Sequence, residues 1–191
     1  MAAFDHCKDL NDVALKPRLL LSLLKDNVPD ETYPFRDPSE LSSIVSNLKN
    51  HKLLFEDFPS AADDKLVRIW ESAFDSWLDR ILVLCRSNLS DKCWAGICLL
   101  GVTCTECSST RFLANYSDWF NVLLSHVQPS VTSQIVKVAA CAAISDLLTR
   151  LGGFSNLKKD GNSLAGKLVQ PVLKILNENV TEAVLVSVYL F

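Results

Sequence analysis

The chain has 191 residues, of which 49% are hydrophobic and 21% charged, and its formal net charge is −3. This composition is typical of one folded soluble domain over residues 1–191 and excludes an intrinsically disordered chain. The small negative charge provides no general attraction for nucleic acid or acidic membranes. We therefore predict no direct nucleic-acid site and no membrane association.

The first helix is expected over residues 2–26, interrupted or kinked by Pro17, because proline lacks the amide hydrogen that a helix needs. The sequence contains only six glycines and seven prolines, and strand-like alternation is scarce, so helices are favoured throughout. The apolar face of this first helix consists of Leu20, Leu21, Leu23 and Leu24. A proline-containing loop follows, and Ser39 is predicted to cap a short helix that ends near Asn50.

A long amphipathic helix is predicted from Ser60 to about Ser87. Its apolar stripe recurs at helical spacing and consists of Leu66, Trp70, Ala73, Trp77, Ile81 and Leu84. The charged residues lie off this stripe, which is typical of a helix that packs on a larger body with one face. Asp75 and Asp79 stand one helical turn apart, but they lie on the predicted solvated face and do not indicate a catalytic pair.

The stretch from Asp91 to Leu124 is the predicted centre of the fold, because it is the longest weakly charged part of the chain. Helical spacing places Cys93, Ile97, Leu100, Cys104 and Cys107 on one apolar stripe. Trp94, Ile97, Cys98 and Gly101 form a second stripe beside it. A helix with so much apolar circumference is predicted to be buried.

Start and stop signals divide this stretch into two helices. Ser90 and Asp91 predict the start of the first helix, and Ser108 with Ser109 predicts its end. We therefore predict a helical hairpin at the centre of the fold, with Trp94 and Trp119 in its core.

Two glycines lie inside the predicted central helix. Gly96 and Gly101 each cost about 1 kcal/mol of helix propensity relative to alanine. The expected compensation is the close approach of a neighbouring helix at positions where a side chain would clash.

The next predicted helix runs from Val131 to Leu151, with an apolar stripe of Val136, Ala140, Ala143, Leu147 and Leu151. Gly152 and Gly153 are expected to end it. A helix over residues 164–177, bent at Pro171, and a last helix from Thr181 follow. Strongly apolar helices thus begin near Ser90 and Val131, a spacing of about 40 residues that is typical of HEAT and armadillo repeats. We predict an all-α fold of helical hairpins stacked as a short HEAT/armadillo-like α-solenoid.

The last residues of the chain, 184–191, are almost all apolar. A terminal repeat of a solenoid normally carries a polar outer face. We therefore expect the chain to be a fragment or short form of a longer protein, or a partner to cover this end. Leu185 and Val188 are candidate partner-binding residues on that basis.

The cysteines indicate packing rather than chemistry. Their number is seven, which is odd, and their helical spacing favours reduced thiols in a cytosolic or nuclear compartment. Cys104 and Cys107 form a CxxC pattern, but they lie on an apolar stripe, and a zinc site would need two further ligands. No nucleophile, metal or phosphate-binding motif accompanies them. We predict a protein that is not an enzyme and that needs no cofactor.

The leucines of the first helix permit two interpretations. Leu20 to Leu24 match LxxLL, an amphipathic pattern that docks into hydrophobic grooves. Leu20, Leu23 and Leu24 are therefore candidate partner-binding residues, and a transcription coregulator is the alternative function. Docking would require this face to be free, and an ordinary core face is the favoured interpretation of the same leucines.

The central stretch also carries a family resemblance. The segments WAGICLLG at 94–101 and YSDW at 116–119, with Cys107-Ser-Ser and Phe112 between them, resemble the N-terminal domain of the Rix-type pre-rRNA-processing proteins. This family is known in animals as the proline-, glutamate- and leucine-rich proteins. The opening AAFDH and the later AISDLLTRL at 143–151 are similar to plant members in particular.

The resemblance covers essentially the whole chain, but only the first part of a family protein. It implies a helical-repeat scaffold in a nuclear complex, present in nucleolus and nucleoplasm, that matures the large (60S) ribosomal subunit. The partners it implies are a WD-repeat protein, a further helical-repeat protein and a AAA-type ATPase on the pre-60S particle. It implies no catalysis.

Overall fold

The computed structural model describes residues 15–27, 38–55, 63–154, 158–159, 162–163 and 168–174. Within these ranges the main helices are α1 (Lys16–Asn27), α2 (Pro38–Asn50), α3 (Asp64–Cys85), α4 (Ser90–Glu106), α5 (Ser109–Ser125) and α6 (Gln134–Gly153). A short antiparallel pair joins β1 (Lys158–Lys159) to β2 (Asn162–Ser163). A further helical segment covers residues 168–174. The described part of the chain is therefore almost entirely helical, as predicted.

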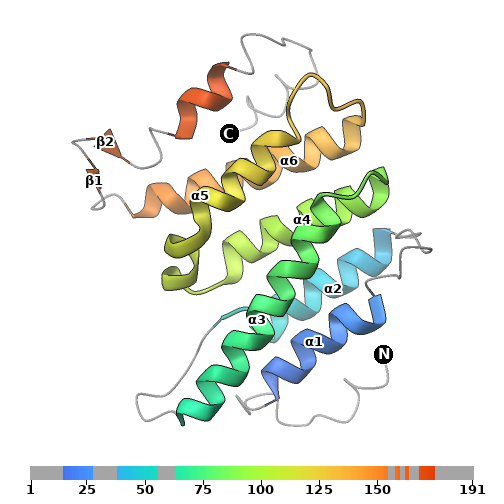
Figure 1. Cartoon of the computed structure of the whole chain (residues 1–191), viewed down its shortest axis with the longest axis vertical. Coiled ribbons are helices and arrows are strands. Elements are labelled where there is room, and N and C mark those ends of the chain that lie inside the picture. Colours follow the sequence, from blue (N-terminus) through green and yellow to red (C-terminus); the bar gives the residue numbers. More distant parts are fainter. Residues whose placement is uncertain are drawn as a thin grey trace.

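The helices form two layers. In Figure 1, α1, α3 and α5 lie in the nearer layer, and α2, α4 and α6 lie behind them and are drawn fainter. Within the nearer layer α1 packs along α3, and in the other layer α4 lies between α2 and α6. The layers are joined because α3 packs on α4 and α5 packs on α6. The apolar helix α4 is thus the central element, as its sequence predicts.

The two helices of the predicted central hairpin exist, but their main contacts are with other helices. Helix α4 packs most extensively on α6 and on α3, and its contact with α5 is small. The physical reason is the pair of small residues Gly101 and Ala143, which brings α4 and α6 close together. The prediction of an α4–α5 hairpin at the centre was therefore wrong in its pairing, and the hairpins are α3/α4 and α5/α6.

Helix α3 confirms the predicted stripe. Trp70, Ala73, Trp77, Ile81 and Leu84 are buried, whereas Leu66 is half-buried. The helix starts at Asp64, later than predicted, because the side chain of Asp63 accepts a hydrogen bond from the backbone N–H of Lys65 at 2.9 Å and caps it. The indole N–H of Trp77 donates to Thr103 Oγ1 at 3.0 Å and ties α3 to α4.

Several predicted helix starts require correction. Pro17 is the second residue of α1, where the missing amide hydrogen costs nothing, so the described helix begins beside Pro17, which agrees with an interruption and not with a kink. Helix α2 begins at Pro38, which places Ser39 inside its first turn. The N-cap of α4 is Leu89, and Ser90 is the first helical residue. The part of the first predicted helix before residue 15 lies outside the described residues.

Both glycines of α4 lie where neighbouring helices come close. A Cβ atom on Gly96 would be 2.6 Å from the backbone nitrogen of Cys85 in α3. A Cβ atom on Gly101 would be 3.2 Å from the Cβ atom of Ala143 in α6. The expectation that these glycines permit close helix packing is confirmed.

The two tryptophans of the central stretch differ in burial. Trp119 is 2% exposed. Trp94 is only half-buried and packs against the core from outside it. The prediction of a core position is therefore confirmed for Trp119 and was too strong for Trp94.

The apolar stripe predicted for α6 is buried throughout. Gly152 and Gly153 are its last two residues, and Phe154, with a φ of −91°, is the C-cap. Of the helix predicted over 164–177, residues 168–174 are described. The helix predicted from Thr181 lies outside the described residues. None of the described helices is both long enough and apolar enough to cross a membrane.

Candidate partner-binding surface

Two leucines of the LxxLL pattern, Leu20 and Leu23, contribute to the core. Leu20 is fully buried and Leu23 is 4% exposed, because α1 packs along α3. The side chain of Leu24, together with Leu185 and Val188, lies outside the described residues. Docking through LxxLL would require α1 to leave the core, so the structure does not favour the coregulator function. Partner binding through these residues stays a prediction.

The thiols lie in an environment that suppresses thiolate chemistry. Cys104 and Cys107 are buried, and burial raises the pKa of the Cys104 thiol well above its ordinary value. Burial also raises the pKa of Cys85 to about 12 and that of Cys98 to about 11. The thiolate is the nucleophile and the metal ligand, so neutral thiols such as these serve as packing groups. Among the described residues, no group of three or more potential ligands is placed to hold a metal ion.

We expect the stability of the protein to fall as the pH rises from about 9 towards 12. The unfolded Cys85 thiol ionises near 9.0, whereas the folded one has a pKa of about 12. Below pH 9 the thiol is neutral in both states, and above it proton release favours the unfolded state. One such group lowers the free energy of unfolding by at most about 1.4 kcal/mol per pH unit. Urea titrations at pH 8 and pH 10 measure this decrease.

Cys85→Ala is the matched variant for this measurement, since it removes one buried thiol and leaves the other titrating groups in place. Its stability should decrease less between the two pH values than that of the wild type. An equal decrease would show that Cys85 does not carry the effect. Rapid reaction of Cys85 or Cys104 in the native protein with a disulfide reagent at pH 8 would contradict their burial.

Two arginines, Arg150 and Arg111, connect neighbouring helices through polar contacts, and the sequence did not single out either of them. Arg150 of α6 donates hydrogen bonds to the backbone carbonyls of Cys104 and Cys107 at the C-terminal end of α4. Its guanidinium carbon lies 4.6 Å from the centre of the Phe112 ring. A cation at this end of a helix is favoured by the helix dipole. Arg150 thus fixes α4 to α6.

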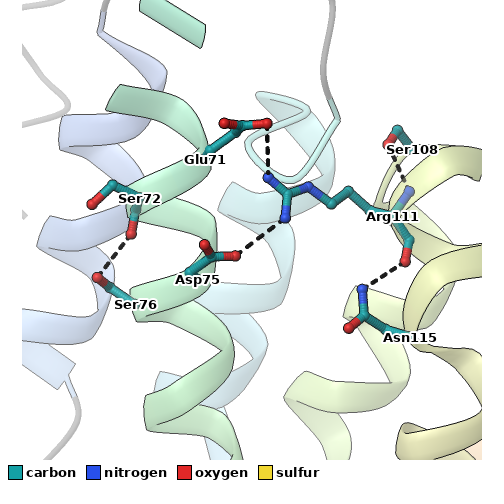
Figure 2. A network of polar contacts seen from close by, with 7 residues as sticks. All are labelled: Glu71, Ser72, Asp75, Ser76, Ser108, Arg111 and Asn115. Atoms are coloured by element: carbon teal, nitrogen blue, oxygen red, sulfur yellow. Dashed lines mark hydrogen bonds and ion pairs between the residues drawn. The ribbon is translucent and has the colours of Figure 1, made fainter. Parts of the chain in front are cut away.

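Arg111 of α5 joins the neighbouring helix of its own layer (Figure 2). Its guanidinium lies 3.2 Å from Asp75 Oδ1 and 3.6 Å from Glu71 Oε1 of α3. It also lies within 5.4 Å of the ring centres of Trp70 and Phe74. Asp75 therefore forms an ion pair with Arg111 and does not act as one half of a carboxylate pair with Asp79. Glu71 and Asp75 stand one helical turn apart on α3, a spacing that suits one basic side chain. Only the fold identifies Arg111 as that side chain.

A groove of about 330 Å³ lies between α4 and α6, next to the end of α2. Small or apolar residues form its floor: Cys98, Gly101, Val102, Ala139, Ala142 and Ala143. The polar margin of the groove consists of its polar lining residues, Lys49, Thr105, Glu106 and Asp146. Burial raises the pKa of the Asp146 carboxyl, although the charge of Lys49 opposes this shift. The sequence did not predict that a groove would remain open between these helices.

The comparisons with known proteins support the resemblance found in the sequence. The family model RIX1, described as rRNA processing/ribosome biogenesis, matches residues 16–189. No curated protein and no solved structure gave a significant match. The matched range includes all of α1 to α6, so it covers both layers and the segments at 94–101 and 116–119. The chain therefore belongs to the RIX1 family of rRNA processing and ribosome biogenesis.

Proposed function

We propose that this protein is a non-catalytic helical scaffold for pre-rRNA processing and for the biogenesis of the large (60S) ribosomal subunit. The observation that carries this proposal is the RIX1 family match over residues 16–189. The roles of the cysteines and of the two arginines also support it. The buried thiols pack in the core, and Arg150 and Arg111 hold helices together. Such a molecule offers surfaces to partners.

We infer further that the hairpins stack as a short HEAT/armadillo-like solenoid. Successive pairs α1/α2, α3/α4 and α5/α6 alternate between the two layers (Figure 1), and within the layers α1 packs on α3 while α2 and α6 pack on α4. Stacked helix pairs of this kind form extended binding surfaces. The layer of α2, α4 and α6 then provides a continuous surface for partners.

The resemblance to the Rix-type proteins supports the choice of partners. We propose that the scaffold binds a WD-repeat protein and a further helical-repeat protein. Together they act with a AAA-type ATPase on the pre-60S particle, in the nucleolus and nucleoplasm. The same resemblance supports a role in removal of the second internal transcribed spacer.

Affinity purification of the tagged protein from nuclear extract tests this function. Pre-60S proteins, and precursor rRNA that still contains the second internal transcribed spacer, should be enriched over an untagged control. Depletion of the protein should increase the amount of that precursor, and expression of the wild-type chain should restore it. Purification without any pre-60S component, together with normal processing after depletion, would contradict the proposal.

A further inference from the structure

The exposed face of α6 carries an apolar stripe that ends in a carboxylate. Ile135 and Val138 are 55% and 49% exposed, and Ala142 is also exposed. At 100° per residue these three positions share one side of the helix with Ala139 and Asp146. From Ile135 to Asp146 the stripe is about 16 Å long, or three helical turns. We call these five residues the α6 stripe.

The groove lies beside the second half of the α6 stripe. Ala139, Ala142 and Asp146 belong both to the stripe and to the groove. The opposite wall, on α4, contributes Gly101 and Val102. Because both walls carry small side chains, the backbone of a third helix can approach them closely. An apolar groove of this shape fits the apolar face of an amphipathic helix.

The polar margin of the groove has an excess of negative charge, with two carboxylates, Glu106 and Asp146, against the single ammonium group of Lys49. Asp146 is exposed, and within the part of the chain that the structure describes it has no ion pair within 4 Å, although the charge of Lys49 acts on its pKa. The Asp146 carboxyl is partly desolvated, which raises its pKa. A cation supplied by a bound partner would offset that desolvation.

We propose that the groove between α4 and α6 binds a basic amphipathic helix of a partner protein, about three turns long. The apolar face of that helix covers the α6 stripe, and one of its lysines or arginines pairs with Asp146. The proposal goes beyond the scaffold function, which assigns the layer of α2, α4 and α6 to partners but no particular groove or kind of partner, and its test does not depend on ribosome assembly.

Two other occupants fit the groove less well. Residues 181–191 of this chain are apolar, but they contain Glu182 and no basic residue, so their charge does not complement Asp146. A second copy of the chain would bring the same acidic margin against itself. The charge of the groove therefore favours a basic partner.

A synthetic helical peptide tests the proposal on the full chain. The probe is a fluorescein-labelled peptide of about three turns, with leucines along one face and arginines beside them. Its matched control has glutamate at each arginine position. Fluorescence anisotropy should show that the arginine peptide binds at least about tenfold more tightly. Equal affinities for the two peptides, or no binding of either, would overturn the proposal.

Two variants locate the site. Asp146→Asn should weaken binding of the arginine peptide about threefold to tenfold and leave the glutamate peptide unchanged. Ala142→Glu should abolish binding, because it fills the floor of the groove. Val83→Glu is the control, since Val83 is an equally superficial apolar residue (67% exposed) on α3, and it should bind like the wild type. Binding that survives in Ala142→Glu and Asp146→Asn would place the peptide elsewhere and reject the groove.

Ala142→Glu and one further variant, Leu185→Glu, distinguish the other occupants. If Leu185→Glu raises the peptide affinity about tenfold, residues 181–191 occupy the groove and the partner is not needed. If sedimentation shows a dimer that Ala142→Glu dissociates, the occupant is a second copy. Either result would overturn the proposal. Unchanged affinity in Leu185→Glu and a wild-type monomer would support it.

Discussion

Replacing Gly96 by alanine is expected to lower the free energy of unfolding by about 1–3 kcal/mol, the usual cost of overpacking a core. Alanine is the better helix former by about 1 kcal/mol, but the contact with α3 outweighs that gain. The added Cβ atom would lie 2.6 Å from the backbone nitrogen of Cys85 and 2.9 Å from the carbonyl carbon of Leu84. Backbone atoms cannot rotate away, so α3 and α4 must separate. Urea denaturation measures the loss, and Gly96→Val should lose more.

Gly152→Ala is the matched control for this substitution. Gly152 lies in the last turn of α6, and a Cβ atom there would meet nothing within 4 Å. Alanine should therefore stabilise the protein by about 0.4–1 kcal/mol. If Gly96→Ala stabilised the protein by the same amount, α3 and α4 would not be packed as closely as the structure shows.

Replacing Trp119 by alanine is expected to cost about 3–5 kcal/mol, because the side chain is fully surrounded. Trp119 is 2% exposed, and its ring meets Phe112 edge to face at a centroid distance of 6.4 Å. The loss is a large share of the 5–15 kcal/mol that stabilises a typical domain. Thermal unfolding should show a markedly lower midpoint, or the variant should fail to give soluble protein.

Trp94→Ala provides the comparison, since Trp94 is a tryptophan of the same central stretch but is only half-buried. Its cost should be about half as large, roughly 1.5–2.5 kcal/mol, because the transferred apolar area is smaller. A Trp94→Ala variant as unstable as Trp119→Ala would contradict the burial that separates the two residues.

Local periodicity was sufficient to predict most helices and the faces they bury. The stripe from Trp70 to Leu84 and the stripe from Cys93 to Cys107 both lie in the core, because the burial of a helix face depends mainly on the spacing of its own apolar residues. Helix starts were less predictable. Asp63, Pro38 and Leu89 define starts that Ser60, Ser39 and Ser90 were expected to define, since several capping residues stood close together.

The sequence by itself determined that this protein is helical, that α4 is central and that Gly96 and Gly101 lie at close contacts. The segment at 94–101 also identified the family that the RIX1 match confirms. These properties depend on residues near one another in the chain, and each can be seen in a single helix or motif.

Only the tertiary structure decided which helices meet at those contacts. Gly96 meets α3 and Gly101 meets Ala143 of α6, so α4 pairs with helices other than the adjacent α5. The same arrangement brings Arg111 to Asp75 and leaves a groove beside Asp146. Periodicity describes one helix at a time, whereas pairing depends on how the shapes and charges of the packed helices fit together.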